Sequence, residues 1–216
     1  GVMWKTWGGG IGAVTSTVTT AQASSAPQSA LLNFNCDTVI EFDEMVTGNP
    51  MVAGQWTMTA EVYAPTGFDG ISMFIVMNEY TDPGAGNEWA VQVYFNGSTG
   101  QVDCDCGIGG TASAPLIFDS WEEVRWEIDL DADRVKFFYR DSLVGAYVWS
   151  KGTDGLSSFA NRKVDAIDLW PQAASTNGSN VYLDNIKIVD LNNTSVGTPF
   201  CPGDGNYAPC PCVNPN

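Results

Sequence analysis

Three acidic residues, Glu127, Asp129 and Asp131, stand at alternate positions of one stretch of the chain. Side chains two residues apart in a β-strand point to the same face, and two carboxyl groups flanking a bond can cleave a glycoside. A retaining glycosidase holds its carboxyl groups about 5–5.5 Å apart, whereas strand backbone from residue 127 to residue 131 spans roughly 13 Å. Asp131 is short and falls in an expected turn. The pattern therefore favours an exposed charged face over a catalytic pair.

Histidine is absent from the sequence. This excludes Ser-His-Asp and Cys-His nucleophiles, imidazole bases and His-ligated zinc within these residues. An enzyme would have to use carboxylates, Tyr, Lys or Arg. We expect a protein that is not an enzyme. We expect it to have no cofactor, and the alternative is that it binds a structural calcium ion.

Aromatic residues beside amides and carboxylates suggest a second kind of site, because saccharides are recognised by ring stacking and hydrogen bonds. Gln92 and Tyr94 are spaced to share one strand face, as are Asp168 and Trp170. The competing interpretation places most aromatic residues in the core, since the chain has eight Trp and ten Phe. The candidates for glycan binding are Asn78, Tyr80, Gln92, Tyr94, Asp168 and Trp170.

Strands must position these side chains, and the clearest strand pattern runs from Trp121 to Trp149. Polar and apolar residues alternate over 123–130, which indicates a strand with one buried face. If residues 131–134 form a turn, a hairpin follows, and a third strand is expected over 143–149. The predicted cross-strand pairs are Leu130–Val135, Ile128–Phe137, Trp126–Tyr139 and Asp129–Lys136.

Similar patterns predict about eleven strands and no helix, separated by turn signals about every 8–12 residues. Two short apolar pieces within 29–43 are expected to pair as the first strands. One β-sandwich domain is predicted over 29–190, flanked by irregular extensions over 1–28 and 191–216. The other expected strands are Gln55–Tyr63, Ile71–Met77, Glu88–Phe95, Val164–Trp170 and Asn180–Val189.

Several stretches in this order resemble the concanavalin A-like lectin/glucanase superfamily in its laminin-G-like branch. They are WEEVRWEIDLDADRVKFFYRDSLVGA, GQWT, FIVMN, WAVQVYFNG, VDAIDLW and VYLDNIKI, and they are similar to secreted bacterial members of that superfamily. The resemblance implies an all-β antiparallel jelly-roll sandwich, and it leaves activity open because the fold serves lectins, glycanases and structural proteins. Within this resemblance, Glu127, Asp129 and Asp131 are similar in spacing to the acidic strand motif of laminarinase-type glycosidases. Asp184 resembles an acidic residue that carbohydrate-binding sandwiches carry beside structural calcium.

Cysteine content and charge predict the surroundings of the protein. Six cysteines without histidine fit an oxidising compartment, so we expect a secreted protein, extracellular or at the cell surface. Nine basic against 25 acidic residues give a net charge of −16, which disfavours nucleic acid as a partner. No apolar run is long enough to insert into a membrane.

The cysteines allow fifteen pairings, and the preferred ones join Cys36 to Cys104 or Cys106, and Cys201 to Cys210 or Cys212. Asn96, Asn177, Asn192 and Asn193 each begin a glycosylation sequon, which predicts exposed turns.

Trp4 and Trp7 stand in a Gly-rich segment with no core of its own. They must pack on the sandwich, on a ligand or on another subunit. We therefore expect a non-catalytic structural or adhesive subunit that self-assembles, as in a filament or surface layer, through its extensions, with other copies as partners. A lectin-like module that binds polysaccharide is the alternative, and a glycanase or polysaccharide lyase ranks third. Removing residues 1–10 is expected to abolish assembly and to spare sugar binding.

Overall fold

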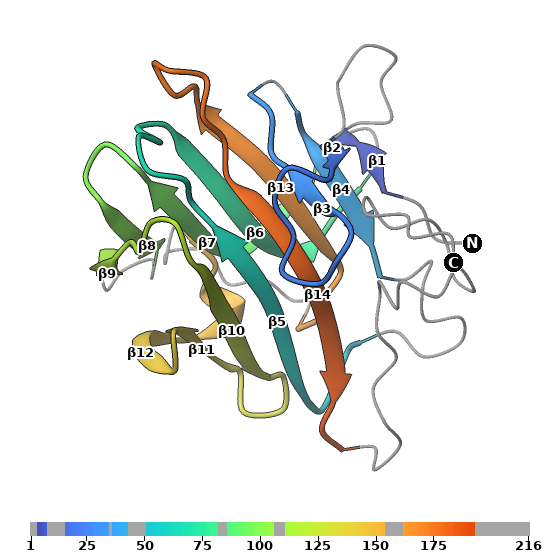
Figure 1. Ribbon diagram of the computed structural model, residues 1–216. Coiled ribbons are helices and arrows are strands. Elements are labelled where there is room, and N and C mark those ends of the chain that lie inside the picture. The colour runs from blue at the N-terminus through green and yellow to red at the C-terminus, as the bar shows by residue number, and fades with distance from the viewer. Residues whose placement is uncertain are drawn as a thin grey trace.

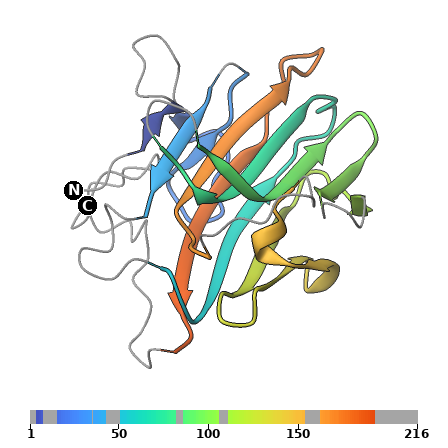
Figure 2. The ribbon, with the colours of Figure 1, turned by 180° about the vertical axis from the view of Figure 1, so that it is seen from behind.

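The computed structural model describes residues 4–7, 16–34, 36–42, 51–81, 86–105, 111–153 and 162–192. Within these ranges the chain forms fourteen strands arranged as two antiparallel seven-stranded sheets. Figure 1 shows β5, β10 and β14 of one sheet in front of the other sheet, and Figure 2 shows the two layers from behind. In this described part of the chain, no helix has the length and apolar character needed to span a membrane.

The first sheet has the strand order β1-β4-β13-β6-β7-β8-β9. Its strands are β1 (Lys5–Thr6), β4 (Thr38–Glu41), β13 (Ala166–Ala173), β6 (Ile71–Glu79), β7 (Glu88–Asn96), β8 (Gln101–Asp105) and β9 (Thr111–Pro115).

The second sheet has the order β12-β11-β10-β5-β14-β3-β2. Its strands are β12 (Ser142–Tyr147), β11 (Arg134–Tyr139), β10 (Trp121–Asp129), β5 (Gln55–Tyr63), β14 (Tyr182–Asp190), β3 (Ser29–Leu31) and β2 (Thr17–Thr19). A short 3-10 helix, η3 (Trp149–Lys151), follows β12.

The main core lies between the two sheets. Phe74 of β6 meets Trp126 of β10 with ring centroids 4.5 Å apart, and Phe137 of β11 lies 5.3 Å from the same Trp126. All three side chains are fully buried. Aromatic pairs at this separation add to the stabilisation from apolar burial.

A smaller apolar cluster covers the outer face of the first sheet, where Met73, Ile75 and Met77 of β6 pack with Tyr80 and Ala166. This second cluster explains why β6 is buried on both faces and reads as an almost continuous apolar run. The strand predicted over Ile71–Met77 is confirmed, and it continues to Glu79. The second cluster also shows that the outer face of this sheet carries its own packed layer.

The predicted meander from residue 121 to residue 147 forms, but its register was wrong by two residues. Ile128 pairs with Val135 and Trp126 with Phe137, because the turn takes in Leu130 and leaves Arg134 in the strand. A shift of two residues preserves the side-chain alternation. The apolar side chains of β10 therefore still face the core, as predicted. The expected third strand ends at Tyr147, and Trp149 begins η3.

The two first strands were also wrongly paired. β3 pairs with β14 and β2 in the second sheet, whereas β4 pairs with β13 and β1 in the first sheet. The chain between them crosses from one layer to the other, which sequence periodicity does not reveal. Part of the segment expected to be irregular over 1–28 forms edge strands, since β1 and β2 lie there. Most of the expected extension over 191–216 lies outside the described residues.

Candidate ligand-binding cavity

A cavity of about 330 Å³ opens on the outer face of the first sheet. Strands β6, β7 and β13 form its floor, and residues next to β1 and β4 form one side. The cavity therefore does not extend into the core between the two sheets. The lining residues are Trp7, Asp37, Ile75, Trp89, Gln92, Asp168 and Trp170.

Strand register brings the polar floor together. Asp168 of β13 pairs with Ile75 of β6, which pairs in turn with Gln92 of β7, so the three residues form one row across the sheet. Trp170 and Tyr94 lie in the next row on either side of Met73. The prediction that Gln92 and Tyr94, and Asp168 and Trp170, share strand faces on one sheet is confirmed.

A β-bulge places Trp89 in the cavity. Val76 pairs with Val91 and Met77 pairs with Trp89, so Ala90 is an extra residue in β7. Trp89 and Gln92 are three residues apart and would point to opposite faces of a regular strand. Because the bulge resets the alternation, both side chains line the cavity.

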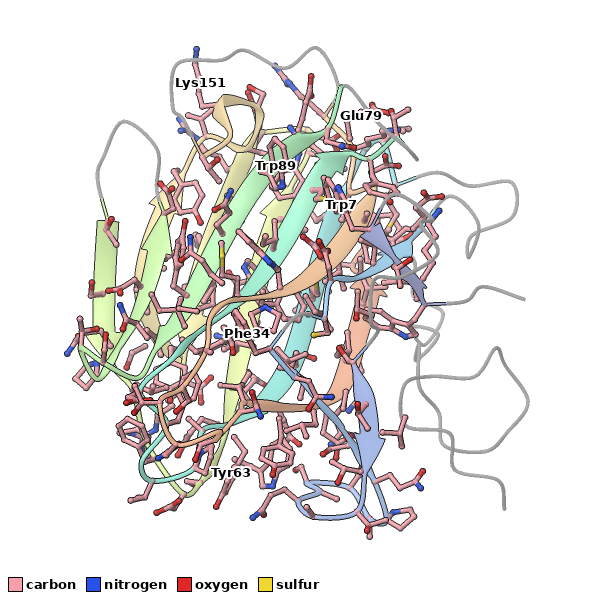
Figure 3. All side chains as sticks on the ribbon, turned by 90° about the horizontal axis from the view of Figure 1, so that it is seen from above. Trp7, Phe34, Tyr63, Glu79, Trp89 and Lys151 are labelled. Carbon is pink, nitrogen blue, oxygen red and sulfur yellow. The ribbon has the colours of Figure 1, made fainter. Side chains whose placement is uncertain are left out.

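Trp7 forms a wall of the cavity next to Trp89. Its backbone amide donates to the carbonyl oxygen of Asp37 (3.1 Å), immediately after β1 pairs with β4. Its ring stacks on Trp89 at 6.2 Å with an interplanar angle of 12° and meets Tyr80 edge-on at 5.1 Å. Figure 3 labels Trp7 and Trp89 side by side at one end of the sheet. Two parallel indole rings therefore stand beside the polar floor.

The carboxyl groups of Asp37 and Asp168 contact each other in the cavity. Burial is the main cause that raises the pKa of Asp168 well above its usual range, and the nearby charge of Asp37 adds to it. Burial also raises the pKa of Asp37, against the lowering effect of its hydrogen bond with Asp168. Like charges this close cannot both ionise easily. The pair therefore retains a shared proton to higher pH than a solvated aspartate would.

Gln92 is oriented by its neighbours on both sides. Its Oε1 accepts a hydrogen bond from Tyr94 Oη (2.7 Å), and its Nε2 donates to Thr153 Oγ1 (3.5 Å). Burial raises the pKa of Tyr94, with Asp105 and Asp103 adding to the shift, so this hydroxyl stays protonated and donates. Such fixed amides hold a definite donor and acceptor direction for a ligand.

The glycan-binding candidates fall into three groups. Gln92, Asp168 and Trp170 line the cavity, while Tyr94 and Tyr80 support it through Gln92 and Trp7. Asn78 does not line it. Its place in the site was wrong because Asn78 is the extra residue of a bulge between Met77 and Glu79, and its side chain is fully buried.

Sequence reasoning missed Asp37, Ile75 and Trp89 as site residues, and it assigned Trp7 to assembly. The sequence signal for Trp7 was present, since an indole in a Gly-rich segment was expected to pack on the sandwich, a ligand or another subunit. The pairing of Asp37 with Asp168 depends on β4 lying beside β13, which no local pattern reveals.

The acidic trio lies on the solvent side of the other sheet, with Glu127 and Asp129 on β10 and Asp131 in the turn that follows. Glu127 forms ion pairs with Arg125 (3.6 Å) and Lys136 (3.7 Å), and Asp129 accepts a hydrogen bond from Gln55 Nε2 (2.8 Å). Asp131 accepts from the backbone amide of Gly54 (3.0 Å). These carboxylates already have partners within the fold, in keeping with the exposed charged face that the sequence favoured.

Asp184 is buried, and its carboxylate accepts hydrogen bonds from the backbone amides of Ser24, Ser25 and Asn185. It fastens the segment after β2 onto β14. Calcium needs several converging oxygen ligands, and no group of three or more acidic, Cys or His side chains converges in the described ranges. The hydrogen bonds to Asp184 give it a structural role, and calcium binding there stays a prediction.

The predicted disulfide between Cys36 and Cys104 was wrong, because Cys36 is a buried free thiol. The alternative pairing of Cys36 with Cys106 involves a residue outside the described ones. Cys36 precedes β4, and Cys104 lies on β8, four strands away in the same sheet. At a strand spacing of roughly 4.8 Å this separation is near 19 Å, whereas bridged Cα atoms lie within about 7 Å. Cys104 instead contacts Tyr147 Oη at 2.9 Å. Cys106, Cys201, Cys210 and Cys212 lie outside the described residues.

Three of the predicted sequon residues are described. Asn177 and Asn192 are exposed, and Asn96 is partly buried at the turn after β7, where its Oδ1 accepts from Ser98 Oγ (2.7 Å). Asn193 lies outside the described residues. Glycosylation at these positions stays a prediction.

No family model matches the chain, and no curated protein matches its sequence. Similarity appears at the level of structure. A sialidase superposes with a TM-score of 0.52 and 9% identity over 83% of this chain and 16% of its own. The sialidase of Trypanosoma rangeli gives 0.53 and 13% over 79% of this chain and 26% of its own.

Alginate lyase A1-II', a member of polysaccharide lyase family 7, gives a TM-score of 0.50 and 12% identity over 80% of this chain and 77% of its own. This chain therefore spans only about a quarter or less of the sialidases, but most of the lyase. Identities this low show the fold alone. The chain folds as a concanavalin A-like jelly-roll β-sandwich, as the sequence predicted.

Proposed function

We propose that this protein is a carbohydrate-binding module that holds a saccharide in the cavity on the outer face of the first sheet. The observation that carries the proposal is the cavity itself, which Trp7, Trp89 and Trp170 line together with Gln92 and Asp168. Indole rings stack on the apolar faces of sugar rings, while amides and carboxyl groups bond to hydroxyls. Trp170 is 39% exposed and so remains available to a ligand.

Binding without catalysis is part of this proposal. A retaining glycosidase holds its two carboxyl groups about 5–5.5 Å apart, and an inverting one about 6.5–9.5 Å. Asp37 and Asp168 are in direct hydrogen-bonding contact, which is closer than either arrangement. Glu127, the residue on which a glycanase or lyase would depend, lies on the other sheet. We therefore expect no cleavage of any polysaccharide that the protein binds.

Self-assembly is the less supported alternative. Trp7 packs on Trp89 and Tyr80, and Trp4 packs against the main core, so this chain's own sheets account for both indoles. Removing residues 1–10 would also remove a cavity wall. That truncation therefore no longer separates assembly from sugar binding, and sedimentation of the intact chain is the appropriate test. Secretion stays a prediction from cysteine content and charge.

The test compares two tryptophan variants by titration calorimetry against a panel of oligosaccharides. Trp170→Ala removes a cavity wall, and Trp121→Ala removes an indole that packs on Tyr63 in the other sheet (5.5 Å). We expect Trp170→Ala to weaken binding about fivefold or more, since stacking on an aromatic ring contributes about 1 kcal/mol or more. Trp121→Ala should bind as the natural chain does. Equal effects of the two variants, or no binding to any saccharide, would refute the proposal.

A further inference from the structure

Two buried acceptor atoms in the cavity lack partners. Asp37 Oδ1 and Asp168 Oδ1 have no hydrogen-bond donor in the described structure, and Asp168 is only 4% exposed. A buried carboxyl oxygen without a donor is unfavourable. A ligand that brings hydrogen-bond donors to this point would relieve that cost.

The carboxyl pair also lacks a counter-charge. In the described part of the chain, no basic side chain forms an ion pair with Asp37 or Asp168. Lys5 of β1 is engaged by Glu41 of β4 at 2.6 Å. The cavity therefore presents negative charge, and none of its lining residues is basic.

Indole rings make the same cavity favourable for a cation. Aromatic faces carry partial negative charge and attract an ammonium group within about 6 Å of the ring centroid. Trp7 and Trp89 stand as a stacked pair, and Trp170 lies beside Asp168 on β13. An ammonium group has three donors and no acceptor, so it satisfies both the carboxyl oxygens and the rings.

We propose that the cavity selects saccharides that carry a protonated amine, such as glucosamine units, and holds the ammonium group between the indole rings and the Asp37–Asp168 pair. This inference rests on the proposed function and names the ligand class of that same site. Acidic sugars are disfavoured, because a carboxylate brought beside this pair would meet like charge in a partly dehydrated space.

Ammonium binding should displace the proton that the two carboxyl groups share. The other titratable groups around the pair are not expected to release a proton on binding. Cys36 stays neutral because burial is the main cause that raises its pKa to about 11, and Lys5 is paired with Glu41. Tyr94 also stays neutral, because burial raises its pKa. Asp105 of β8 pairs with Gln92 and so is separated from the aspartate pair by the strands β7 and β6. Binding should therefore release protons, whereas binding of a neutral sugar should not.

The experiment titrates the full chain with a tetramer of β-1,4-linked glucosamine and with the fully N-acetylated tetramer. Calorimetry at pH 6 in two buffers of different ionisation enthalpy measures both affinity and proton release. We expect the glucosamine tetramer to bind at least tenfold more tightly and to release protons. Asp168→Asn, with Asp37→Asn as a second variant should the first not fold, should reduce this preference to about twofold or less. Trp121→Ala should preserve it.

The outcomes separate the two proposals. Equal or tighter binding of the N-acetylated tetramer overturns the inference and leaves carbohydrate binding standing. A preference for glucosamine that survives both aspartate variants also overturns it. Failure of the chain to bind either tetramer or any member of the wider panel overturns both.

Discussion

Asp37 and Asp168 contact each other across the pairing of β4 with β13, although each lies far from the other in the sequence. The contact forms because Asp168 pairs with Val39, two residues beyond Asp37. A like-charged pair in a partly buried position is unfavourable for folding. The pair is therefore not explained by stability, whereas the proposed role in ligand binding would account for it.

The pair predicts a particular pH dependence of stability. Its pKa values are raised, so the folded chain binds more protons than the unfolded chain above pH of about 4, the usual pKa of aspartate. The stability that it contributes is therefore fully present below about pH 4 and lost as pH rises through the raised pKa values. Asp168→Asn should gain free energy of unfolding relative to the natural chain between pH 4 and pH 8. Urea denaturation of both chains across this pH range measures the difference in unfolding free energy. A difference that does not change with pH would contradict the prediction.

Asp69 predicts the opposite dependence. Hydrogen bonds from the side chain of Ser175, and then from Thr176, lower the pKa of Asp69 to about 2. Its stabilising effect is present above about pH 4, and it is lost as pH falls through about 2. Asp69→Asn should therefore lower the melting temperature at pH 6 and leave it nearly unchanged well below pH 2. A full deficit that persists well below pH 2 would show that charge is not the cause.

Asn78 should be replaceable with a gain in stability. Both side-chain amide atoms are buried without a hydrogen-bond partner in the described structure. Leucine has the same branching and no polar atoms, so Asn78→Leu should stabilise the fold by about 1–2 kcal/mol by removing the unpaired groups. Equilibrium unfolding in guanidinium measures the change. A loss of stability would indicate that ordered water bonds to the amide.

Cys36 should resist alkylation in the folded protein. The thiol is buried beside Ser16 and Thr38, and its pKa of about 11 leaves almost no reactive thiolate at pH 8. Peptide-resolved mass spectrometry after iodoacetamide treatment should find Cys36 unmodified in the native chain and modified in urea. Recovery of Cys36 in a disulfide-linked peptide would contradict this arrangement.

Trp7 should stabilise the chain as well as its cavity. Removing its ring abolishes the contacts with Trp89 and Tyr80. Because Trp7 is only partly buried, we expect Trp7→Ala to cost about 1–3 kcal/mol of unfolding free energy. Denaturant unfolding measures this cost. Unchanged stability would mean that the indole is not packed on the sheet in solution.

The sequence predicted those features that depend on side-chain alternation. The strand over 55–63 has the bounds that were predicted, and the inward residues of β10 face the core even though the hairpin register was wrong. Alternation has a period of two, so an error of two residues leaves the faces correct.

The rest depended on contacts that alternation does not encode. The bulge at Ala90 brings Trp89 beside Gln92, and the bulge at Asn78 removes that residue from the site. Neither bulge has a glycine or proline to mark it. The neighbourhood of β4 and β13 is likewise set by the whole fold, so Asp37 could not be matched to Asp168 in advance.

Two short strands near the beginning of the chain, β1 and β2, form the outermost strand of one sheet and of the other. They occupy the hydrogen-bonding groups of β4 and β3 that would otherwise lie open to pairing with another molecule. Removing this segment would expose the edges of β4 and β3 at the same time. Aggregation of such a shortened chain would then result from exposed sheet edges, and it would not be evidence of natural self-assembly.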